Sequence, residues 1–146
     1  MPQRWATTQN NVSGLATVHF FEIVNTSEAA SIKGVSAKLK EIRPSAPNFG
    51  WLPVTLLQKH DNPLPGVPHS KTFNLNPGEP IHIDLVSAFQ RDQHISIRHI
   101  VNMINTLIPA GRYELQVMIT AEDMPVLFQW FEVWMDDLGI LQCEMK

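Results

Sequence analysis

The sequence has almost no cysteine, no long apolar run and no concentration of one charge. Its single cysteine, Cys143, cannot form an internal disulfide or supply a cysteine-rich zinc site, so packing alone must hold the fold. The longest apolar stretches, such as Val126-Leu127-Phe128, fall far short of the ~20 residues that cross a bilayer. The eleven Lys and Arg residues are scattered and the net charge is −3, which argues against nucleic acid as a partner.

The beginning of the sequence also lacks the apolar run of a secretory signal, a feature that leaves the compartment open. Motifs that carry catalysis are missing too, because there is no Gly-x-Ser-x-Gly, no glycine-rich phosphate loop and no His-Glu-x-x-His. The pair His60-Asp61 lies in a loop where a hydrolase could expose it, but no serine sits in a recognisable elbow. We therefore expect no catalytic residues and no cofactor.

Metal ligands can be combined in two ways, and neither is complete. A blue-copper site needs histidine after its cysteine on the same loop, and none follows Cys143. His94 and His99 are five residues apart, which puts them on opposite faces of a strand. His82 and Asp84 share one face but supply only two ligands, so we interpret them as a solvated polar face and expect no metal site.

The residues that are abundant indicate a β-protein. Eleven prolines and seven glycines separate short apolar runs, a pattern typical of many short strands. With 146 residues and 44% apolar residues the chain matches one domain that can bury a core. We expect residues 1–14 to be a flexible lead-in arm, because they are polar and lack an apolar face, and residues 15–146 to form one domain.

Period-two patterning is clearest from Arg112 to Ala121, where Tyr113, Leu115 and three further apolar residues share one face. The segment Asn76-Pro77-Gly78-Glu79 predicts a type II turn with glycine at the position of positive φ. Residues 95–108 are ambiguous, so we allow one short helix near residues 97–107. Further strands are expected at residues 15–24, 35–39, 51–58, 72–75, 81–86, 127–135 and 140–145.

Four segments carry a family resemblance: EIVNTS (22–27), GVSAKL (34–39), LNPGE (75–79) and PAGRYEL (109–115). Together they resemble bacterial immunoglobulin-like domains, although Ser27 stands where glycine is commoner. The resemblance implies an all-β, immunoglobulin-like antiparallel sandwich of about 7–9 strands. It also implies an accessory module of a bacterial envelope-associated protein, with no catalytic residues to transfer.

Two predicted strands are apolar on both faces, which a sandwich strand does not require. One of them carries Phe128, Trp130 and Trp134 on its second face, and with Trp51 they form a candidate interaction surface. Other parts of the chain or a partner, including a second copy in a twofold dimer, would have to cover it. We expect a non-catalytic interaction or structural module; the alternatives are a carbohydrate-binding module that stacks sugars on exposed tryptophans, and then a metal-binding or hydrolytic protein.

Overall fold

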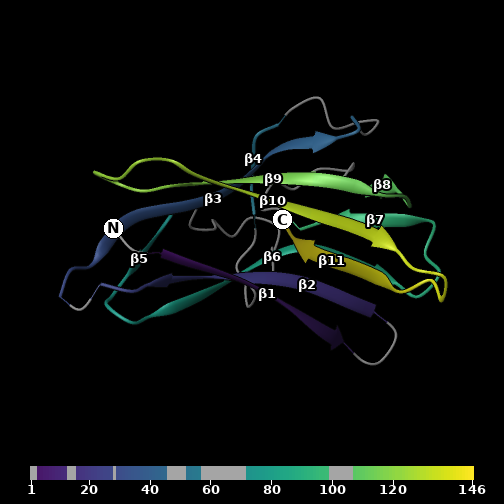
Figure 1. Ribbon diagram of the computed structural model, residues 1–146, viewed down its shortest axis with the longest axis horizontal. Coiled ribbons are helices and arrows are strands. Elements are labelled where there is room, and N and C mark those ends of the chain that lie inside the picture. Colours follow the sequence, from purple (N-terminus) through teal and green to yellow (C-terminus); the bar gives the residue numbers. More distant parts are fainter. Residues whose placement is uncertain (1–2, 13–15, 28, 46–51, 57–71, 99–106) are drawn as a thin grey trace, which may run out of the picture.

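The computed structural model describes residues 3–12, 16–27, 29–45, 52–56, 72–98 and 107–146. In these ranges the chain forms eleven strands and no helix, arranged in two antiparallel sheets. The strands run lengthwise along the molecule, with β1 and β2 at one side and β3 and β9 at the other (Figure 1). The protein is an all-β sandwich, as the sequence predicts. The described residues contain no helix of the length and hydropathy needed to span a membrane.

The first sheet has five strands in the order β1-β2-β6-β7-β8. Their bounds are Gln3–Val12, Ala16–Asn25, Pro80–Phe89, His94–Ile97 and Leu107–Pro109. The second sheet has six strands, five of them in the order β11-β10-β9-β3-β4, while β5 also pairs with β3. Their bounds are Leu141–Met145, Leu127–Met135, Tyr113–Thr120, Ile32–Arg43, Val54–Thr55 and Phe73–Leu75.

The structure has eleven strands where we expected 7–9, because β1, β7 and β8 were not expected as strands; β4, β5, β7 and β8 have only two to four residues each. The chain changes sheet three times, after β2, β5 and β8. Strands β1–β2 and β6–β8 thus belong to the first sheet, and β3–β5 and β9–β11 to the second. The core forms between the two sheets.

The core is built from the inward faces of both sheets. Phe21 from β2 and Phe131 from β10 are both 0% exposed, and their rings stack across the sandwich at 5.3 Å between centroids. In β9 the burial alternates without exception, with Tyr113, Leu115, Val117 and Ile119 buried and the residues between them half-buried. The predicted period of two in this segment is confirmed. Each large side chain removed from water contributes about 1.5–3 kcal/mol to folding.

The first crossing between the sheets is fixed by Asn25, which is 0% exposed at the end of β2. Its amide nitrogen donates hydrogen bonds to the Ala30 carbonyl at 2.7 Å and to the Leu75 carbonyl at 3.1 Å. Its side-chain oxygen accepts the Ser27 backbone N–H at 3.0 Å, which closes the turn that follows β2. One buried amide thus ties the end of β2 to the start of β3 and to β5.

The last crossing is fixed by Tyr113 at the start of β9, whose hydroxyl donates a 2.7 Å hydrogen bond to the carbonyl of Pro109 at the end of β8. The ring is buried while its hydroxyl reaches the backbone four residues upstream. Such a bond holds the chain as it passes from one layer to the other, and it recurs where sandwich strands turn this corner.

Three described glycines, Gly34, Gly78 and Gly139, have a positive φ, which other residues disfavour, and the last two lie in turns. Gly78 has φ +75°, and Glu79 donates its backbone N–H to the Asn76 carbonyl at 3.0 Å, so the predicted type II turn is confirmed. Gly139, in the turn from β10 to β11, has φ +76° and lies against Arg91. A Cβ built there would approach the Arg91 backbone to 2.9 Å, so this position has no room for a side chain.

Part of the expected lead-in arm takes a different form, because Gln3–Val12 is strand β1 and pairs along its length with β2. A polar segment can complete a sheet edge when its neighbour supplies the backbone partners, and no apolar period announces it. Of the segment where we allowed a short helix, Ile97 ends β7 and Leu107 begins β8; residues 99–106 lie outside the described ranges.

Candidate interaction surface

The second face of β10 is the outer face of the second sheet. Phe128, Trp130 and Trp134 alternate with the buried Phe131 and Val133, so all three predicted aromatics point away from the core. Phe128 is 48% exposed, and both tryptophans are half-buried. The structure thus brings three of the four predicted surface residues onto one strand. Trp51 lies outside the described residues, as do His60, Asp61 and His99.

Each of the three aromatic rings is paired with a cation from a neighbouring segment. Lys40 places its ammonium 4.8 Å from the ring centroid of Phe128. The Arg43 guanidinium lies 4.6 Å from the Trp130 ring, and the guanidinium of Arg112 lies 4.6 Å from the Trp134 ring. At exposed positions a cation–π contact contributes about 0.5–1 kcal/mol. We call these six residues the aromatic–cation surface.

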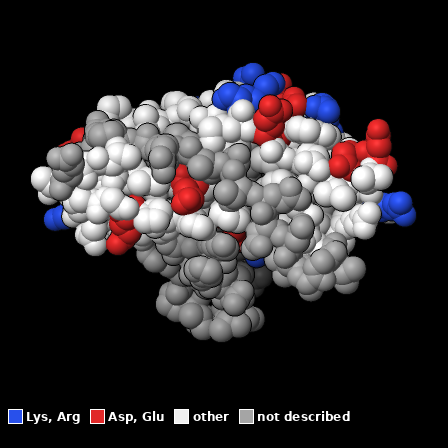
Figure 2. Space-filling model, turned by 60° about the horizontal axis from the view of Figure 1, so that its bottom comes forward, with Lys and Arg blue, Asp and Glu red and all other residues white. Residues whose placement is uncertain are grey.

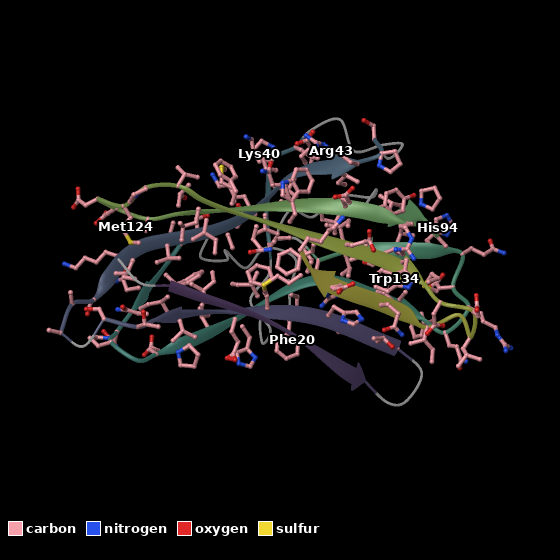
Figure 3. All side chains as sticks on the ribbon, viewed as in Figure 1. Phe20, Lys40, Arg43, His94, Met124 and Trp134 are labelled. Carbon is pink, nitrogen blue, oxygen red and sulfur yellow. The ribbon has the colours of Figure 1, made fainter. Side chains whose placement is uncertain are left out.

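The register of the sheet explains how these pairs form. β9 lies between β3 and β10, so side chains of β3 must reach across β9 to contact those of β10. A register shift between Leu39 and Glu41 adds Lys40 as an extra residue and returns Arg43 to the outer face opposite Glu114. Figure 3 shows Lys40 and Arg43 on the upper side of the molecule, with Trp134 further along the same sheet.

Acidic residues on the same face balance the cations. Glu114 and Glu132 stand directly opposite each other on β9 and β10, where like charges would repel. The Lys146 ammonium lies 3.3 Å from Glu114 and 3.6 Å from Glu132, and Arg112 forms a further ion pair with Glu132. These contacts, with the Glu114 hydrogen bond first, raise the pKa of Lys146. The surface therefore carries both signs of charge within a few residues.

The cations were not identified from the sequence. Lys40, Arg43 and Arg112 are ordinary members of a scattered basic set, and only the pairing of β3 with β9 brings two of them to the aromatic strand. What the sequence did reveal was an apolar second face that needed cover. In β10 a large part of that cover is intramolecular and consists of basic side chains, whose charged groups lie over the rings.

A second polar cluster lies on the outer face of the first sheet. His82 stacks on Phe20 with 4.9 Å between the ring centroids, and its Nε2 lies 3.5 Å from a Glu22 carboxylate oxygen. Asp84 stands opposite Phe20, 3.7 Å from the Nε of Arg98. Figure 3 shows Phe20 on the lower side of the molecule, away from Lys40 and Arg43.

The interpretation of His82 and Asp84 as a solvated pair is wrong for Asp84, which is only 4% exposed. The cause is a bulge: β2 passes directly from His19 to Phe20, while β6 passes from Val86 to Asp84, leaving Leu85 as the extra residue. A simple alternation could not place Asp84 correctly. His82 itself is half-buried, with 34% of its side chain exposed.

The remaining chemical candidates lie on different sheets. His94 is exposed on β7, whereas Cys143 on β11 lies opposite Val133 and packs against the core. Burial raises the pKa of the Cys143 thiol to about 12, which disfavours the thiolate that metals and electrophiles require. Among the described residues no three His, Cys, Asp or Glu side chains gather as metal ligands.

The charge on the rest of the described surface is mixed. In the view of Figure 2, basic and acidic side chains are interspersed over the described part of this face. Comparison with protein-family models, with curated proteins and with solved structures gave no match.

Proposed function

We propose that this chain is a non-catalytic interaction module of immunoglobulin-like architecture, and that the aromatic–cation surface on the second sheet is its binding face. The observation that carries the proposal is the row of Phe128, Trp130 and Trp134 on one strand, each with a cation already stacked on it. Trp and Arg are enriched at the energetic centres of protein interfaces. Side chains held in place before binding lose less conformational entropy on association.

The architecture is supported by the resemblance of the four sequence segments and by two structural features. The Tyr113 hydroxyl bonds back to Pro109 at a corner between the sheets, as in many immunoglobulin-like domains. The strand order places β2 and β6 in one sheet and β3, β9 and β10 in the other. An accessory role in a bacterial envelope-associated protein follows from the resemblance and is part of the proposal.

The partner we propose is a second copy of the chain. The face carries Arg43, Arg112 and Lys146 beside Glu114 and Glu132, so a twofold axis can set cations of one copy against carboxylates of the other. A protein partner of one charge would leave part of this face unmatched. Closed twofold dimers are also the commonest assemblies of soluble proteins.

The experiment is size-exclusion chromatography with light scattering over a wide range of concentrations. The proposal predicts a concentration-dependent dimer that Trp130→Ala weakens. Phe89→Ala is the matched control, because Phe89 is an aromatic residue 60% exposed on the first sheet and its removal should leave the dimer intact. A strict monomer at every concentration, or equal weakening by both variants, contradicts self-association through this face.

Carbohydrate binding through Trp130 and Trp134 is the other reading of exposed aromatics, and the arrangement favours it less. A sugar that stacks on either ring competes with the guanidinium already lying over it. A glycan array provides the test: binding that is lost in Trp130→Ala but kept in Phe89→Ala would replace the proposed protein partner by a carbohydrate.

A further inference from the structure

A polar pocket of about 490 Å³ opens on the same sheet, along the edge of β3. Two short strands pair with successive stretches of that edge: β5 with Ile32 and Val35, and β4 with Lys38 and Leu39. The pocket lies where β4 and β5 diverge, and it is lined from β3, from both short segments and from the end of β9. Its volume is within the range of small-molecule sites in proteins.

The lining is dominated by groups that donate hydrogen bonds. Four of the lining side chains, Ser36, Thr55, Thr72 and Thr120, carry hydroxyls, and the fifth polar one is the ammonium of Lys38. The register explains their convergence, because Ser36 stands opposite Thr120 and Lys38 stands opposite Thr55. Among the described residues that line the pocket there is no carboxylate side chain. Hydroxyls beside an ammonium are complementary to an oxyanion and a poor set for a metal cation.

Lys38, like Lys33 on the same strand, differs from four other described basic residues in or beside this sheet. Lys40, Arg43, Arg112 and Lys146 each contact an aromatic ring or a carboxylate. Across the described ranges, by contrast, no carboxylate oxygen lies within ion-pairing distance of the Lys38 ammonium. No described carboxylate therefore compensates the charge of Lys38 at the pocket.

Ser36 supplies the independent observation. It is 5% exposed, and its hydroxyl oxygen is buried without a hydrogen-bond partner. Leaving a buried hydroxyl unsatisfied costs about 1–3 kcal/mol, so most native proteins avoid it. Because Ser36 belongs to the pocket lining, rotation about χ1 is the smallest movement that gives this hydroxyl a partner, and the partner would be a ligand in the pocket.

We propose that this pocket binds a small molecule through a carboxylate or phosphate group, with Lys38 supplying the charge and the surrounding Ser and Thr residues supplying hydroxyl hydrogen bonds. The site is distinct from the aromatic–cation surface and does not depend on the proposed dimer. Three probes separate the chemistries: glucose 6-phosphate, glucuronate and glucose share a sugar ring and differ in the anionic group.

The test is an NMR titration of the full chain with each probe at constant ionic strength, following the backbone amides of Ser36, Lys38, Thr55 and Thr120. The proposal predicts saturable shifts with glucose 6-phosphate, with glucuronate or with both, and the probe that saturates assigns phosphate or carboxylate. Glucose should cause no saturable shift. If neither anion saturates, or if glucose binds as well as they do, the proposal is overturned.

Two variants and a control place the binding at this pocket. Lys38→Gln should weaken the anion affinity about tenfold or more, because it removes a charged hydrogen bond. Thr120→Val, which keeps the shape of the side chain and removes the hydroxyl, should also weaken it. Lys33→Gln changes an exposed lysine on the same strand that does not line the pocket, and it should leave the affinity unchanged. Equal losses in the two lysine variants would show general charge attraction and refute the site.

Discussion

Replacement of Asn25 by alanine tests whether one buried amide fixes the first crossing between the sheets. The side chain makes three hydrogen bonds, to Ala30, Leu75 and Ser27, and the residue is 0% exposed. At about 1 kcal/mol for each bond, with a further penalty for buried groups left unpaired, Asn25→Ala should cost about 2–4 kcal/mol. That is a large fraction of the stability of an ordinary domain.

The assay is urea unfolding followed by tryptophan fluorescence, with the free energy of unfolding taken from the midpoint and slope. Asn25→Asp should cost at least as much as alanine, because it replaces the amide nitrogen and its two N–H donors by a charged oxygen that faces carbonyl groups. The matched control is Gln90→Ala, which removes an exposed amide that donates one 3.1 Å hydrogen bond to the Leu138 carbonyl. If Asn25→Ala costs no more than the control, within about 0.5 kcal/mol, the reasoning is refuted.

Three further outcomes follow from the same structure. Leu115→Ala, at a position 0% exposed, should lower the free energy of unfolding by about 2–5 kcal/mol, while Gln116→Ala on the outer face should change it by about 0.5 kcal/mol or less, as urea unfolding can show. Gly78→Ala should cost about 1–2 kcal/mol for its positive φ alone, since nothing beyond its chain neighbours lies within 4 Å of the added Cβ. Gly139→Ala should cost more, because the Arg91 backbone lies 2.9 Å from the added Cβ. Equal losses of stability in the two variants would contradict the close approach at Gly139. Burial lowers the pKa of His19 below its ordinary value of 6.5, despite an opposing backbone hydrogen bond. The unfolded chain therefore takes up the proton first, so the stability that is present above about pH 6.5 should decline as the pH falls toward the folded-state pKa. A free energy of unfolding that stays constant between about pH 7 and 5 would contradict this.

Much of the fold could be predicted because its determinants are local. In β9 every inward position carries an apolar residue, and a strand with one buried face shows that period directly. The turn at Gly78 was equally readable, since proline and glycine fix its two central residues. Strand β1 could not be predicted from the sequence, because its place in the sheet depends on pairing with β2 and not on an apolar face of its own.

The site was only half predictable for a related reason. Phe128, Trp130 and Trp134 reveal themselves by alternation along one strand, so the sequence alone places them on one face. Two of their cations, Lys40 and Arg43, come from β3 and reach β10 across β9, and a register shift in β3 decides which basic residues arrive there. Asp84 shows the same effect on the first sheet, where one extra residue changes its surroundings. Bulges of this kind depend on pairing between distant segments.

The central structural claim is that β2 and β10 belong to opposite sheets and meet in the core through Phe21 and Phe131, whose ring centroids are 5.3 Å apart. The most direct measurement is a nuclear Overhauser effect between the ring protons of these two residues. We predict a strong cross-peak, because rings at this separation place their protons within range of the effect. Assigned spectra that show no cross-peak between the two rings would contradict the sandwich.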